Sequence, residues 1–216
     1  TGWATSTTAT SSAVNPAESE AMQCLEEGTQ KLEEGDVQAA KELYRRSVDI
    51  KKTPSGLFNL GVTHYHLKEF DDAISVWKES IALQPSSPDA HTNIASAYIV
   101  SPVSRPDLAL HHLRVASSLA PGDGEIAFNL AAVLEACGLL EESLECYNKS
   151  KESGVERAAM HARNVSAKIL GKKMKELAEA EGKGDRRCRG CAPRSKSARR
   201  RRHCIELRRM YFTLTC

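Results

Sequence analysis

The stretch that decides the fold is residues 57–85, which read LFNLGVTHYHLKEFDDAISVWKESIALQP. A small residue, Gly61, is followed twelve positions later by Ala73 and four positions after that by Trp77. Pro85 closes the stretch, because proline cannot continue a helix. A unit of this kind that recurs along a chain indicates stacked structural repeats.

The same order of residues recurs on both sides of this stretch. In each unit a small residue is followed by a second small residue and then by a bulky one. The first small residues are Gly28, Gly61, Ala95 and Ala131, the second are Ala40, Ala73, Ala109 and Ser143, and the bulky ones are Tyr44, Trp77, Leu113 and Tyr147. We expect the small residues to let two helices of a hairpin approach closely, and the bulky residue to fill the gap to the next hairpin.

The third unit departs from the common spacing. Ala95 and Ala109 are fourteen residues apart, where the other units have twelve. The insertion carries Pro102 and Pro106, which are expected to stop one helix and restart the next. Pro121 then closes this unit. We therefore predict four helical hairpins.

These spacings resemble the tetratricopeptide repeat, whose period is about 34 residues. The resemblance covers residues 18–153 and is also carried by HTNIASAYIV and DLALHHLRVASSLAP in the third unit. It implies an all-α fold, a right-handed α-solenoid of about four hairpins. Residues 156–181 continue as an amphipathic helix, which we predict to be the solvating cap of the array.

Three segments are predicted along the chain. Residues 1–14 are rich in Ser and Thr and are expected to be disordered. The repeat domain with its capping helix is placed at 15–182, with Asn15 as the helix cap and Pro16 at the first helical position. The tail, 183–216, holds twelve Lys or Arg and two acids, a net charge of +10. Because the whole chain carries +2, the rest carries −8.

The composition also bounds the expected location. No stretch approaches the roughly 18 uninterrupted apolar residues that span a bilayer, so no membrane partner is expected. The polar segment Thr1–Ser12 lacks the apolar core of a secretory signal. The seven scattered cysteines are an odd number and suggest no disulfide framework, which favours a reducing compartment. We expect a cytoplasmic protein, with a nuclear location as the alternative.

No motif of a known catalytic site occurs in the sequence, so we expect no enzyme and no cofactor. Cys188 and Cys191 have a spacing that can hold zinc, and His203 with Cys204 could complete four ligands. The second pair is adjacent, however, whereas zinc motifs space both pairs. We interpret these cysteines as incidental and predict no metal site.

Four asparagines stand two positions before the small position of successive units. Asn59, Asn93, Asn129 and Asn164 are separated by 34, 36 and 35 residues. In the resembled family this helix lines the concave groove, and such a row is similar to the ladder that grips extended peptides. The alternative is that each asparagine only bonds a neighbouring helix. By helical phase, the groove walls are expected to include Phe58, Tyr65, Thr92, Ser96 and Phe128.

The resemblance implies a non-catalytic scaffold or adaptor that binds a peptide or partner subunit in this groove, within a multiprotein complex. The oligomeric state is left open. Relatives that hold the C-terminal carboxylate of heat-shock chaperones use Lys and Asn in the first unit. Leu25 and Thr29 stand at those places here, so a chaperone tail is disfavoured as the partner.

The basic tail supports a different function. Its two arginine clusters resemble a bipartite nuclear-import signal, and the same charges could bind nucleic-acid phosphates without sequence preference. The clusters are Arg186 and Arg187, then Arg199, Arg200, Arg201 and Arg202. The alternative function is therefore a nuclear, nucleic-acid-associated protein that uses its C-terminal tail. A solvated tail without such a role is the third interpretation.

Overall fold

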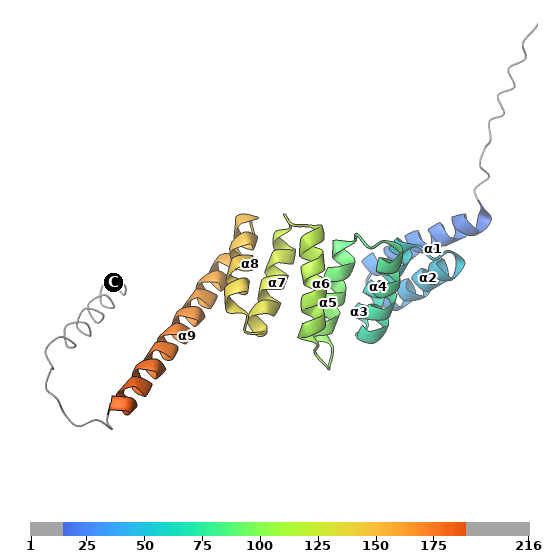
Figure 1. Ribbon diagram of the computed structural model, residues 1–216. Coiled ribbons are helices and arrows are strands. Elements are labelled where there is room, and N and C mark those ends of the chain that lie inside the picture. Colours follow the sequence, from blue (N-terminus) through green and yellow to red (C-terminus); the bar gives the residue numbers. More distant parts are fainter. Residues whose placement is uncertain (1–14, 189–216) are drawn as a thin grey trace, which may run out of the picture. The chain divides into compact units, whose positions relative to one another are not determined.

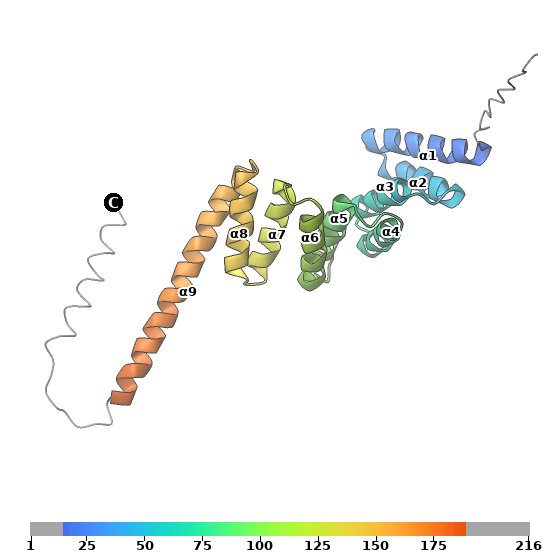
Figure 2. The same ribbon diagram turned by 45° about the horizontal axis from the view of Figure 1, so that its top comes forward.

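The computed structural model of the chain describes residues 15–188, with side chains up to residue 180. This part contains nine helices and no strand. Eight helices pair into four hairpins that follow one another along the chain (Figures 1 and 2). The hairpins are α1 (Pro16–Glu33) with α2 (Val37–Ile50), α3 (Pro54–His66) with α4 (Phe70–Leu83), α5 (Pro88–Val100) with α6 (Pro106–Leu119), and α7 (Gly124–Ala136) with α8 (Leu140–Glu152). The predicted all-α solenoid is confirmed.

The ninth helix, α9, spans Arg157–Cys188. The chain divides within it into two compact units, one ending at Ile169 and the next beginning at Leu170. In the first unit α9 buries Ala162 and Val165 against Tyr147 of α8, as a capping helix should. None of the helices within residues 15–188 is both long and apolar enough to cross a membrane.

The end of α9 differs from the sequence prediction. The helix continues past residue 181 to Cys188, so the first residues of the predicted basic tail are helical. Gly182 and Gly184 each weaken a helix, but the Lys and Arg residues among them have good helix propensity. The predicted disordered segment 1–14 and the tail from residue 189 onward lie outside the described residues.

The first helices of three hairpins begin in the same way, with a capping side chain followed by proline. The Asn15 side-chain oxygen accepts the Ala17 N–H at 3.2 Å, which confirms the predicted start of α1. Thr53 and Ser87 do the same ahead of α3 and α5. A side-chain oxygen at this position satisfies a backbone donor that the helix itself leaves free, and proline fits the first turn.

The small residues do more than let two helices approach. A Cβ placed on Gly61 would lie 2.4 Å from Nε1 of Trp77, on the partner helix of the same hairpin. The ring of Tyr44 occupies the corresponding space beside Gly28. Each ring also belongs to a core cluster that includes the next hairpin, as with Trp77 and Ile94. The bulky residue thus fills the gap to the next hairpin, as predicted. Its ring also packs against the small residue on the other helix of its own hairpin.

A recurring serine also links the two helices of three hairpins. In hairpins one, two and four, a serine three residues after the aromatic donates its hydroxyl to a carbonyl in the first two turns of the partner helix. The pairs are Ser47 with Ala21 at 2.7 Å, Ser80 with Pro54 at 2.9 Å, and Ser150 with Gly124 at 2.7 Å. The third hairpin has Ala116 at this position and joins its helices through histidines instead.

Candidate functional site

The asparagine row lies on α3, α5, α7 and α9. Asn59, Asn93 and Asn129 are partly exposed, and Asn164 is exposed. Within residues 15–188, none of the four side-chain amides makes a hydrogen bond to another protein group. A bond to a neighbouring helix, the alternative interpretation of the row, is therefore not what holds these asparagines. Their donors and acceptors are free for solvent or for a ligand.

Two of the asparagines lie in hollows that share walls. A hollow of about 200 Å³ between α3, α4 and α5 is lined by Tyr65, Asn93 and Ser96, together with Val62, His66 and Trp77. A second, of about 240 Å³, is lined by Tyr65, Ser96 and Asn129. Its other walls are Ala95, Ile99, Val100, Leu113, Ala132 and Val133. Because Tyr65 and Ser96 line both, Asn93 and Asn129 face one continuous hollowed surface.

Asn59 and its neighbour Phe58 line a different hollow, of about 200 Å³. Its remaining walls come from the start of α3, the end of α4 and the turn into α5, and they are Pro54, Ser55, Ser80, Gln84, Ser87 and Asp89. This hollow has no wall in common with the two that contain Asn93 and Asn129. The predicted row is therefore continuous over its middle two members and separate at Asn59.

The predicted wall residues also differ in what they offer a ligand. Thr92 and Ser96 donate their hydroxyls to carbonyls one turn earlier on α5, those of Pro88 and Thr92, so neither hydroxyl proton is free. Phe128 is covered by α9. The Arg157 guanidinium lies 4.3 Å from the centre of its ring, and the His161 ring packs edge-on at 5.1 Å. Side chains of α9 therefore cover the wall that was predicted at the fourth hairpin.

The apolar residues Ile99, Val100 and Ala132 belong to the second hollow and were not predicted. The sequence held a signal for them, since Ile99 follows Ser96 by three positions and Ala132 follows Asn129 by three. Residues three apart share a helix face.

The predicted tail residues cannot be placed in a site of this kind. Arg186 and Arg187 lie in the helical backbone of α9, and Arg199–Arg202 lie outside the described residues.

A pair of buried histidines joins the helices of the third hairpin. The two Nδ1 atoms of His91 on α5 and His112 on α6 lie 2.9 Å apart, so one ring donates and the other accepts. Burial lowers the pKa of His112 to about 4, and the charges of His91, His111 and Lys78 act in the same direction. Burial also lowers the pKa of His91. At neutral pH both rings are therefore uncharged.

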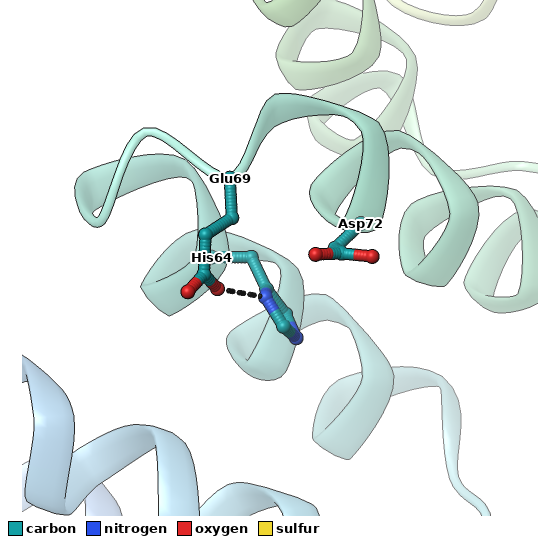
Figure 3. A group of neighbouring side chains, drawn as sticks. All are labelled: His64, Glu69 and Asp72. Atoms are coloured by element: carbon teal, nitrogen blue, oxygen red, sulfur yellow. Dashed lines mark hydrogen bonds and ion pairs between the residues drawn. The ribbon is translucent and has the colours of Figure 1, made fainter.

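His64, Glu69 and Asp72 form the single group within the described residues with the spacing of a metal site (Figure 3). The same Glu69 oxygen contacts His64 Nδ1 at 2.6 Å and the Lys41 ammonium at 2.5 Å. Those two contacts lower the pKa of Glu69. A cation bound here would have to displace Lys41, so the geometry fits an ion pair that ties α2 to the second hairpin better than a metal centre.

The second hairpin connects the chain to a known family. Residues 54–87 match the sequence profile of the tetratricopeptide repeat. No curated protein matches the chain in sequence. Since the other hairpins repeat the helices and the small and bulky positions of this unit, the chain is a tetratricopeptide-repeat protein. The predicted family is thereby confirmed.

Solved structures share the fold at low sequence identity. A MamA fragment from Desulfovibrio magneticus RS-1 is 18% identical with a TM-score of 0.63, over 77% of this chain and 97% of that one. YrrB, described as a tetratricopeptide-repeat protein with an unusual peptide-binding site, is 16% identical with a TM-score of 0.61, over 69% and 78%. The first such domain of Spaghetti (RPAP3), bound to an HSP90 peptide, is 21% identical with a TM-score of 0.51, over 55% and 94%.

Proposed function

We propose that this protein is a non-catalytic scaffold that binds an extended peptide segment of a partner protein. The segment lies over the surface lined by Tyr65, Asn93, Ser96 and Asn129. The observation that carries the proposal is the free state of the amides of Asn93 and Asn129, which are partly buried and bond no protein group within residues 15–188. They line two adjoining hollows that have Tyr65 and Ser96 in common. An asparagine whose role was to join two helices would be expected to hydrogen-bond one of them.

The chemistry of the amide suits backbone recognition. An asparagine side chain offers one acceptor and two donors, which match the alternating C=O and N–H groups of an extended chain. The hollows have open walls made of helix surface, where an enzyme would need a closed pocket with converging reactive groups. The peptide-binding site named for YrrB and the HSP90 peptide bound to the Spaghetti domain support a peptide ligand for this fold. We place the protein in the cytoplasm, with the nucleus as the alternative location, and within a multiprotein complex.

The test is the double replacement of Asn93 and Asn129 by alanine. Each hydrogen bond is worth about 0.5–1.5 kcal/mol, so loss of both should weaken the partner roughly 5- to 150-fold. The partner is first recovered by pull-down with the full chain, and its affinity is then measured by titration calorimetry. Asn148→Ala on α8, an exposed asparagine outside the hollows, is the matched control. Unchanged affinity per folded molecule in the double variant contradicts the proposal.

A further inference from the structure

We infer that the hollow containing Asn129 is a specificity pocket for one large apolar side chain of the bound peptide. This rests on the proposed function and names the class of partner: an extended segment with a Leu-, Ile- or Phe-type anchor and no acidic residue at that place. The pocket is formed by α3, α5, α6 and α7, which contribute Tyr65, Ile99, Leu113 and Ala132 among its walls.

The size of the pocket suits a single side chain. Sites for drug-sized ligands occupy about 300–1,000 Å³. This hollow has about 240 Å³ and opens onto the surface that holds Asn93 through the shared walls Tyr65 and Ser96. A side chain can therefore enter it while the backbone that carries it stays beside the asparagine amides.

The walls of the pocket select an uncharged anchor. None of its nine lining residues is a Lys, Arg, His, Asp or Glu. A charged side chain would lose water there without gaining a partner, which is costly. Asn129 and Ser96 provide the polar edge, and aliphatic or alanine side chains dominate the rest. The −8 charge on residues before 183 also disfavours acidic segments.

Exposed apolar side chains mark the same place. Ile99 and Val100 line the hollow yet remain 37% and 55% exposed, and Val103 in the following turn is 75% exposed. They lie at the end of α5 and in the two-residue insertion that distinguishes the third hairpin. Large aliphatic side chains kept exposed together indicate a surface that another molecule covers.

The experiment uses capped heptapeptides Gly-Ser-Thr-Xaa-Thr-Ser-Gly, with Leu, Phe, Ala, Glu or Lys at Xaa. Each is titrated into the full chain labelled with ¹⁵N, and affinities are taken from amide shifts. The Leu and Phe peptides should bind roughly tenfold to a hundredfold tighter than the Ala, Glu and Lys peptides, because only they bury a large apolar side chain. The shifts should centre on the end of α5 and on α7.

A variant that fills the pocket gives the second readout. Ala132→Trp places a bulky ring in the hollow from an exposed position and should remove the preference for Leu and Phe. Ala82→Trp, on the exposed surface of α4, is the matched control and should keep it.

The outcomes separate the two proposals. If all peptides bind equally and the Asn93/Asn129 double variant weakens them all, the specificity pocket is wrong and the proposed function stands. The pocket is also wrong if Ala132→Trp leaves the preference intact. If no peptide produces shifts at millimolar concentration, the proposed peptide groove fails together with the pocket.

Discussion

Trp77 is the largest of the fully buried side chains in the described part of the chain. Its ring lies against Gly61 of its own hairpin, its Nε1–H donates to the Phe58 carbonyl at 3.0 Å, and its cluster includes Ile94 of the next hairpin. One residue therefore joins three helices, α3, α4 and α5. In a repeat array, where each unit is held by its neighbours, such a contact stabilises both sides of an interface.

We expect Trp77→Ala to lower the free energy of unfolding by about 3–5 kcal/mol, the range for large aromatics truncated in cores. Trp77→Phe keeps much of the volume and loses the hydrogen bond to Phe58, so its cost should be smaller. Urea unfolding followed by circular dichroism measures both. A cost below about 1 kcal/mol for the alanine variant would mean that the ring does not carry this interface.

The pair of His91 and His112 predicts a pH dependence. The pKa of His112 is about 4 in the folded protein, below the ordinary 6.5. Between these values the unfolded chain binds a proton that the folded chain does not, so the free energy of unfolding falls as pH falls. His111 and Lys78 face the pair and act in the same direction.

From pH 7 to pH 5 we expect this histidine to cost about 2 kcal/mol of stability. His112→Gln keeps a polar partner for His91 without titrating in this range, so the loss over the same interval should be smaller in the variant. Urea unfolding at the two pH values measures the difference. Equal losses in the wild type and the variant would contradict the low pKa of the pair.

At the level of single elements, α9 has two roles: it packs on the fourth hairpin, and it covers one wall of the predicted groove. Its first turns bury Ala158, Ala162 and Val165 on the fourth hairpin, and its Arg157 and His161 cover Phe128. The buried positions are three or four apart, the spacing of one helical face. The helix therefore acts as the missing next unit of the array over this part of its length.

Val165→Asp should destabilise the protein by several kcal/mol, because it buries a carboxylate at a position with no exposed surface and no partner. Ser166→Asp, the next residue on the exposed side of the helix, is the matched control and should change stability by less than about 0.5 kcal/mol. Urea unfolding gives the size of both effects, and amide hydrogen exchange should locate the first one in α7 and α8. Equal protection there in both variants would show that α9 does not cap the array.

The helices also show which features can be predicted from the sequence and which cannot. The repeat spacing predicted the helices, and Asn15 with Pro16 predicted the start of α1, because each depends on residues close in sequence. It could not predict that Phe128 is covered by His161, 33 residues later, or that His91 meets His112, 21 residues away. Such pairs depend on how helices cross. The separation of Asn59 from the other asparagines likewise comes from the turn between α4 and α5, which forms its hollow.

For the molecule as a whole, the separation of charge is the feature that the repeat fold leaves unexplained. Residues 183–216 carry +10 and the rest carry −8. If the tail binds nucleic acid, affinity should fall steeply with salt because bound counterions are released. Groove binding through amides and an apolar pocket has no such dependence. A salt titration of the full chain against a DNA duplex therefore separates the alternative function from the proposed one.

The remaining proposal for the tail is nuclear import, in which a receptor reads the arginine clusters. Replacing Arg199–Arg202 by alanine should then move a fluorescent fusion of the full chain from the nucleus to the cytoplasm. The control removes charge elsewhere, at Lys172, Lys173 and Lys175, which are exposed on α9. A receptor-read signal depends on the arginine cluster, whereas nonspecific retention by nucleic acid depends on total charge. Redistribution with the first variant alone supports import, an equal shift with both supports retention, and an unchanged distribution with the first rejects a role for this cluster.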